Sequence, residues 1–71
     1  MFVNVLTNAE NGRQRLYRKD RITSVIYNGK AVVTIHYVGN NGKNRSQGIN
    51  YPSPEFALEQ YNKIMEQLTN K

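Results

Sequence analysis

Seventy-one residues are enough for one small domain with a single core, so the length excludes a multidomain enzyme, a full dinucleotide-binding fold and a repeat solenoid. The composition is 38% hydrophobic and 21% charged, which is ordinary for a globular chain and argues against wholesale disorder. Ten lysines and arginines against five acidic residues give a net charge of +5, and a basic domain favours polyanionic partners such as nucleic acid.

Turn signals divide most of the chain into strands. The dipeptide Asn-Gly, the strongest short signal for a hairpin, occurs three times, at 11–12, 28–29 and 41–42. Val, Ile, Thr and Tyr, which favour strands, are prominent in the middle of the chain. We therefore predict five antiparallel strands, over about 2–7, 14–19, 22–27, 30–38 and 45–51.

A helix is predicted over about 54–69. Ser53 is a suitable N-cap, Pro54 suits the first helical position, and Glu55 complements the positive end of the helix dipole. Apolar residues then recur at spacings of three and four, at Ala57, Leu58, Tyr61, Ile64, Met65 and Leu68. The fold class is therefore α+β: a single domain over 1–71, with an antiparallel meander of about five strands and one C-terminal helix packed on one face.

The two later turns suggest a register for the middle strands. A two-residue loop at Asn28-Gly29 gives one apolar face toward the helix, consisting of Ile22, Ile26, Ala31, Val33, Ile35 and Tyr37. A three-residue loop of Asn40, Asn41 and a left-handed Gly42 aligns Val33 with Ile49. It leaves small residues on the open face beside Thr34 and His36, namely Asn44, Ser46, Gly48 and Asn50.

The second predicted strand contains the densest run of basic residues. Because successive side chains of a strand alternate sides, one face carries Arg13, Arg15, Tyr17 and Lys19. Leu16 takes the other face, where we expect it to join Val3 and Val5 in the core. This arrangement leaves Phe2 and Leu6 beside the basic residues.

The sequence lacks the residues that most enzymatic reactions require. The sequence has no cysteine, which excludes thiol catalysis and thiolate zinc sites, and His36 is the single histidine, so we expect no metal. The neighbours expected for His36, Thr34 and Ser46, do not complete a serine triad. We therefore expect a protein that is not an enzyme and needs no cofactor.

The predicted open sheet face combines basic residues with tyrosine. Proteins that bind single strands use this combination, because cations follow the phosphates and aromatic rings stack on bases. We predict binding of single-stranded DNA or RNA through Arg15, Tyr17, Lys19, Arg21, Tyr27 and Lys30, with Arg45 at the edge. The alternative is a protein interaction or assembly module with no nucleic-acid role, using the exposed apolar candidates Phe2, Leu6, Val25 and Val32.

The stretch from about Arg21 to Leu68 resembles the positive-cofactor-four, or whirly-like, transcriptional coactivators. The likeness is carried by the segments 21–25, 29–37, 42–43, 47–51 and 54–56, with Gln47 where that family has a basic residue. The resemblance implies a curved four-stranded sheet followed by a helix, binding of single-stranded DNA, and a homodimer through Phe56 and Leu58. Nearly the whole chain also resembles small flagellar FlbD-like proteins, in which a short hairpin precedes the same order of elements.

The first residues lack the charged leader of a secretory signal, and no stretch approaches the length of a membrane helix. We therefore expect a cytoplasmic protein with no membrane partner.

Overall fold

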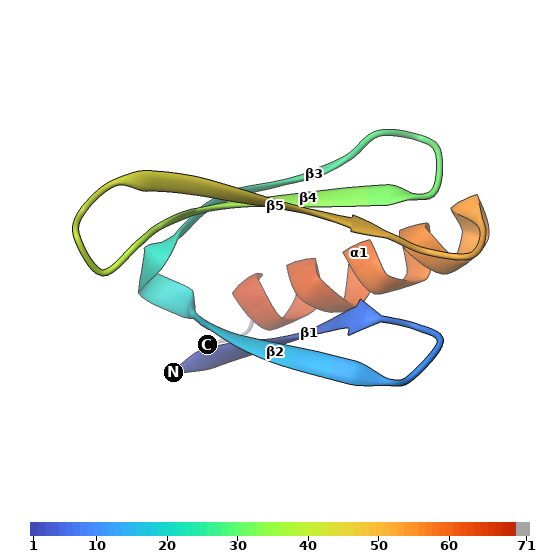
Figure 1. Ribbon diagram of the computed structural model, residues 1–71, viewed down its shortest axis with the longest axis horizontal. Helices are drawn as coiled ribbons and strands as arrows, with labels where there is room; N and C mark the ends of the chain where they lie inside the picture. The colour runs from blue at the N-terminus through green and yellow to red at the C-terminus, as the bar shows by residue number, and fades with distance from the viewer. Residues whose placement is uncertain (70–71) are drawn as a thin grey trace.

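The computed structural model describes residues 1–69. Within these residues the chain forms five strands, one 3-10 helix and one α-helix (Figure 1). In chain order they are β1 (Phe2–Asn8), β2 (Arg13–Arg18), η1 (Lys19–Arg21), β3 (Ile22–Tyr27), β4 (Val32–Val38), β5 (Asn44–Asn50) and α1 (Pro54–Thr69). The predicted α+β class, with five antiparallel strands and a C-terminal helix, is confirmed. No helix in this part of the chain is long and apolar enough to cross a membrane.

The strands form two antiparallel sheets. One contains β1 and β2, and the other has the order β3-β4-β5, so the larger sheet has three strands instead of the four that the coactivator resemblance implies. The short η1 connects the two sheets at one end of the molecule, and α1 packs against β1 of the first sheet and against β3 and β4 of the second (Figure 1). The core lies where these three layers meet, and it consists of Val3, Val5, Tyr17, Val33, Ile35, Ile49, Tyr51, Ala57 and Ile64.

The helix begins as predicted. The backbone N–H of Phe56 donates to Ser53 Oγ at 3.1 Å, and the N–H of Ala57 donates to the Ser53 carbonyl at 3.0 Å. Ser53 is thus the N-cap and Pro54 the first helical residue. The buried side of α1 runs through Ala57, Gln60 and Ile64, at spacings of three and four.

The three Asn-Gly turns share one local geometry. Gly12, Gly29 and Gly42 have positive φ angles of 71°, 80° and 78°, and no other type of residue in the described part of the chain has a positive φ. The preceding asparagine accepts, through Oδ1, the backbone N–H two residues further on, in each case at 3.2 Å or less. A two-residue type I′ turn would need a positive φ at both central residues, so these turns belong to longer loops.

The longer loop changes the register that we predicted for β3. Tyr27 lies opposite Val33, and the N–H of Asn28 donates to the Val32 carbonyl, so the loop has three residues instead of two. Val25 and Tyr27 therefore pack against the core, whereas Ile26, predicted for the core face, is 51% exposed. A register shift between Ile22 and Ser24 returns Ile22 to the core side.

The register predicted for β4 and β5 is confirmed. Val33 lies opposite Ile49, and the N–H of Gly39 donates to the Lys43 carbonyl at 2.8 Å, which encloses a three-residue loop over 40–42. On the outer face, His36 lies opposite Ser46 and Thr34 lies opposite Gly48, as expected.

The faces predicted for β2 are wrong. Tyr17 lies opposite Val3 and is 4% exposed, whereas Leu16 is 61% exposed on the outer face. The cause is the β1–β2 connection, because Asn8 pairs with Arg13 across a four-residue loop and the register shifts between Leu6 and Asn8. The face carrying Arg15 and Tyr17 therefore turns toward the second sheet.

Candidate functional site

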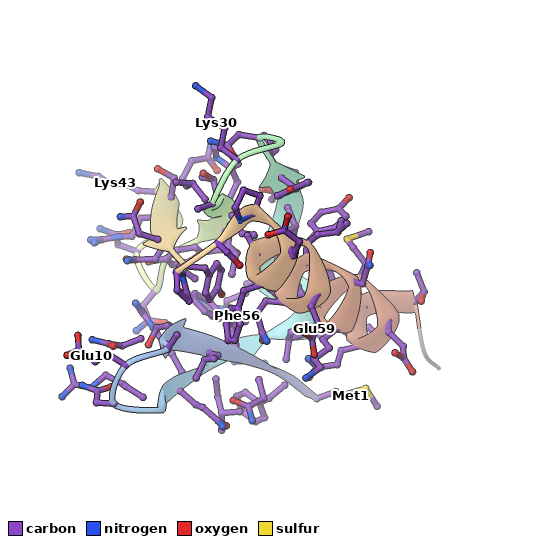
Figure 2. The ribbon with its side chains drawn as sticks, turned by 90° about the vertical axis from the view of Figure 1, so that its right-hand side faces the viewer. Met1, Glu10, Lys30, Lys43, Phe56 and Glu59 are labelled. Carbon is purple, nitrogen blue, oxygen red and sulfur yellow. The ribbon has the colours of Figure 1, made fainter. Side chains whose placement is uncertain are left out.

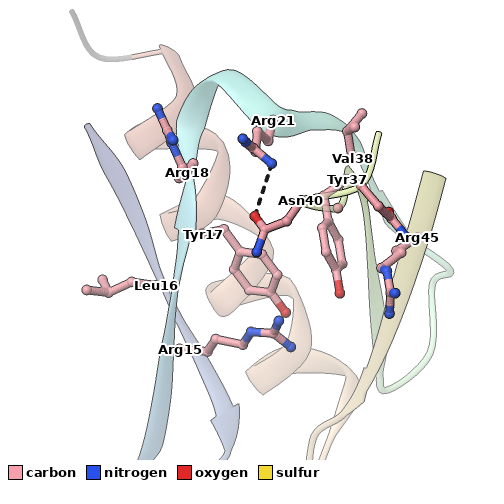
Figure 3. A pocket seen from close by; sticks show the side chains of 11 residues that line it. Arg15, Leu16, Tyr17, Arg18, Arg21, Tyr37, Val38, Asn40 and Arg45 are labelled. Carbon is pink, nitrogen blue, oxygen red and sulfur yellow. Dashed lines mark hydrogen bonds between the residues drawn. The ribbon is translucent and has the colours of Figure 1, made fainter. Parts of the chain in front are cut away.

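A hollow of about 430 Å³ lies where η1 joins the two sheets. Its walls come from β2, η1 and the β4–β5 hairpin, and four arginines line it: Arg15, Arg18, Arg21 and Arg45 (Figure 3). None of the described residues that line it is acidic. We call this feature the arginine hollow.

Two tyrosine rings close the arginine hollow on its inner side. Tyr17 from β2 and Tyr37 from β4 meet edge to face, with ring centroids 5.2 Å apart and planes at 68°. Figure 3 shows both rings between the hollow and α1. Tyr17 belongs to the core and Tyr37 packs against it, so the floor is held by the interior of the domain.

Arg15 lies across this floor. Its guanidinium carbon is 4.9 Å from the centre of the Tyr17 ring and 5.7 Å from that of Tyr37. Arg15 and Tyr17 are two residues apart on one strand and therefore share a face. Cation–π attraction holds the arginine over the rings, and the planar guanidinium keeps its donors for an anion.

The Tyr17 hydroxyl is an exception to the usual pairing of buried polar groups. It is inaccessible to solvent, and its proton has no acceptor within residues 1–69; the polar group beside it, the Arg15 guanidinium, can only donate. Burial raises the pKa of Tyr17, and the nearby Arg15 guanidinium opposes this effect only in part. The hydroxyl is therefore protonated at neutral pH and is a potential donor. By contrast, the buried hydroxyl of Tyr51 donates to the Leu6 carbonyl at 2.6 Å.

The other arginines are held by the loops around the hollow. Arg21 Nη1 donates to Asn40 Oδ1 at 3.2 Å, which joins η1 to the β4–β5 hairpin (Figure 3). The Arg45 side chain packs over Gly39, so that a Cβ added to Gly39 would be 2.9 Å from Arg45 Nε. Arg18 Nε is 3.5 Å from Asp20 Oδ1 in an exposed ion pair. Arg15, Arg21 and Arg45 have no carboxylate partner among the described residues.

The structure brings together four of the seven predicted binding residues: Arg15, Tyr17, Arg21 and Arg45 all line the hollow. They do not lie on an open sheet face opposite the helix, as predicted, because the β2 register turns them toward the second sheet. Their role in binding stays a prediction.

The remaining three predicted residues lie outside the hollow. The Tyr27 hydroxyl donates to the Pro54 carbonyl at 3.2 Å, and its ring packs near Tyr61. Lys30 extends from the β3–β4 loop away from the body of the domain (Figure 2). Lys19 is in η1, where its backbone N–H donates to the Met1 carbonyl.

Sequence reasoning missed the other seven residues that line the hollow: Leu16, Arg18, Tyr37, Val38, Gly39, Asn40 and Asn41. The sequence predicts a core-facing position for Tyr37 and only a turn for the hairpin tip. The sequence does contain one signal, because the side-chain amides of Asn40 and Asn41 follow closely after a strand that carries Tyr37. It contains nothing that brings this tip against η1.

The residues predicted for a homodimer have different environments. Phe56 is partly buried against the core, with its ring 5.7 Å from that of Tyr51, whereas Leu58 is 42% exposed. Phe56 already packs within its own domain, and a dimer through these residues stays a prediction.

The residues described contain no group of three or more His, Cys, Asp or Glu side chains that could hold a metal ion. In comparisons with known proteins, the chain matches no family model, no curated protein and no solved structure. The resemblances to the coactivator and flagellar families therefore stay predictions.

Proposed function

We propose that this domain is a non-enzymatic module that binds single-stranded nucleic acid, DNA or RNA, with the arginine hollow as its phosphate site. The observation that supports the proposal is that Arg15, Arg21 and Arg45 surround a tyrosine floor, with no acidic side chain among the described lining residues. Arginine is suited to phosphate because its fork of donors matches two phosphate oxygens.

The hollow also suits a nucleotide in size and composition. Its volume of about 430 Å³ is within the usual range for sites that bind small molecules. The rims of the tyrosine rings offer apolar contacts to a base, and the amides of Asn40 and Asn41 offer hydrogen bonds to base edges. A strand with splayed bases presents both groups, whereas a duplex presents mainly phosphates.

Binding without catalysis fits the chemistry of the lining residues. The ionisable groups there are arginines and tyrosines, and neither type is a general base near neutral pH. Burial moves Tyr17 further from that role by raising its pKa. A cytoplasmic location is part of this proposal, because single-stranded nucleic acid is available there.

Fluorescence anisotropy with a labelled oligonucleotide, at low and moderate salt, tests the proposal. We expect affinity to fall with salt, and we expect Arg15→Gln and Arg45→Gln each to lower the salt slope by about 0.7, the value for one phosphate contact on a single strand. Lys30→Gln removes the same charge outside the hollow and is the matched control. Binding that is absent, or equally weakened by Lys30→Gln, contradicts the proposal.

A second candidate function is protein interaction or assembly. Phe2 is exposed on the outer face of the β1–β2 sheet, diagonal to the exposed Leu16 on the same face. Such neighbouring apolar side chains can mark an interaction surface. A defined oligomer in sedimentation that persists at high salt, and that Leu16→Ser dissociates, would favour this candidate.

A further inference from the structure

We propose that the arginine hollow takes the terminal phosphate of a strand in preference to an internal phosphodiester. This inference rests on the proposed function and narrows it to one chemical group, a phosphomonoester. Three features of the hollow support it: its closed end, its uncompensated charge and the buried hydroxyl in its floor.

The hollow is closed on more than one side. The Tyr17–Tyr37 pair closes the side toward α1, and η1 closes one end, where the Arg21–Asn40 hydrogen bond joins it to the hairpin (Figure 3). An internal phosphate needs room for a nucleotide on each side. The end of a strand needs a path on one side only, so closure of the hollow at η1 favours a strand end over an internal phosphate.

The charge of the hollow exceeds that of one phosphodiester. Of the four lining arginines, only Arg18 has a carboxylate near it among the described residues, at 3.5 Å. Arg15, Arg21 and Arg45 therefore place three uncompensated positive charges around one small volume. A phosphodiester carries one negative charge, whereas a phosphomonoester carries about 1.5 to 2 near neutral pH and has three acceptor oxygens.

The Tyr17 hydroxyl supplies the most specific feature. It lies in the floor beside the Arg15 guanidinium, buried and with no acceptor for its proton within residues 1–69. A phosphomonoester oxygen that draws Arg15 from the ring face would become the acceptor that this hydroxyl lacks. A monoester has a third acceptor oxygen, which in a diester is used for the second ester bond. This additional oxygen can accept the hydrogen bond from the Tyr17 hydroxyl.

The test compares three oligonucleotides of one sequence and label: one with a 5′-phosphate, one with a 3′-phosphate and one with hydroxyl ends. We expect one phosphorylated end to raise the affinity of the wild-type protein by about tenfold, the effect of one further charged hydrogen bond. Inorganic phosphate should compete with that oligonucleotide more effectively than an equal ionic strength of chloride.

Tyr17→Phe keeps the ring and removes the hydroxyl. We expect this variant to lose most of the preference for the phosphorylated end, measured as the ratio of its affinities for the phosphorylated and the hydroxyl-ended oligonucleotides. A circular dichroism spectrum like that of the wild type shows that the fold is retained.

The outcomes separate the two proposals. Equal affinity for all three oligonucleotides overturns the terminal-phosphate inference and leaves the proposed function in place. If Tyr17→Phe retains the full preference for the phosphorylated end, the Tyr17 hydroxyl does not bind the terminal phosphate, and the inference is overturned. Failure of every oligonucleotide to bind overturns the proposed function itself.

Discussion

The side-chain amide of Gln67 makes two hydrogen bonds with the backbone of Asn4. Gln67 Oε1 accepts the Asn4 N–H at 2.8 Å, and Gln67 Nε2 donates to the Asn4 carbonyl at 2.9 Å. The amide thus pairs with the free edge of β1 as a neighbouring strand would, and it ties the last turns of α1 to the first strand. Gln67 falls outside the apolar positions that recur along the helix, so the sequence pattern gives no sign of this contact.

We predict that Gln67→Ala lowers the free energy of unfolding by about 1 to 2 kcal/mol, because two backbone groups lose their partner. Urea denaturation followed by circular dichroism measures the change. Asn62→Ala, at an exposed position of the same helix, is the control. Equal effects of the two substitutions would show that the amide pair contributes no stability.

Tyr17→Phe and Tyr51→Phe should change stability in different directions. The Tyr17 hydroxyl is buried without a partner, so its removal should leave the free energy of unfolding unchanged or raise it by up to about 1 kcal/mol. The Tyr51 hydroxyl bonds to the Leu6 carbonyl, so its removal should lower that free energy by about 1 kcal/mol. Urea midpoints of both variants test this contrast. A clear loss of stability in Tyr17→Phe would show that the Tyr17 hydroxyl does make a stabilising hydrogen bond.

Alkaline pH should destabilise the fold. Burial raises the pKa of Tyr51 to about 12, above the 10.0 of an exposed tyrosine. The unfolded chain therefore loses its proton first as pH rises. The stability contributed by this tyrosine is complete below pH 10 and is lost between about pH 10 and 12, at about 1.4 kcal/mol per pH unit. Urea titrations at pH 8, 10 and 11 should show the decline, and Tyr51→Phe should reduce it. The same decline in the variant would contradict the assignment.

Gly39→Ala should weaken oligonucleotide binding without unfolding the domain. Gly39 lacks a positive φ, so its backbone tolerates a side chain, but the new Cβ would force Arg45 Nε away from a position 2.9 Å distant. We expect a loss of about threefold to tenfold in affinity, the effect of misplacing one charged hydrogen bond. Gly48→Ala, where a Cβ meets nothing within 4 Å, is the control. Wild-type affinity in Gly39→Ala would argue against a role for the Arg45 position.

Local signals predicted the elements well, and long-range packing decided the rest. The N-cap at Ser53 and the left-handed Gly42 act within a few residues, so the helix start and the β4–β5 register could be predicted. Tyr17 and Ile26 were assigned to the wrong faces, because one residue more or less in a loop reverses the face of a whole strand.

The arginine hollow could be predicted only in part. Arginine and tyrosine were the right residue types, since Arg15 and Tyr17 do share a face. Their meeting with Tyr37 depends on how two separate sheets pack across η1, and no local pattern in the sequence encodes that packing.

The central claim is that the arginine hollow contacts the phosphates of a single strand. An NMR titration of the labelled protein with an oligonucleotide tests it most directly, because each arginine Nε–H gives its own signal. We predict that the signals of Arg15, Arg21 and Arg45 shift together and saturate, while the backbone amides of the outer sheet face near His36 and Ser46 do not move. Shifts centred on that outer face, with the three arginine signals unchanged, would contradict the account.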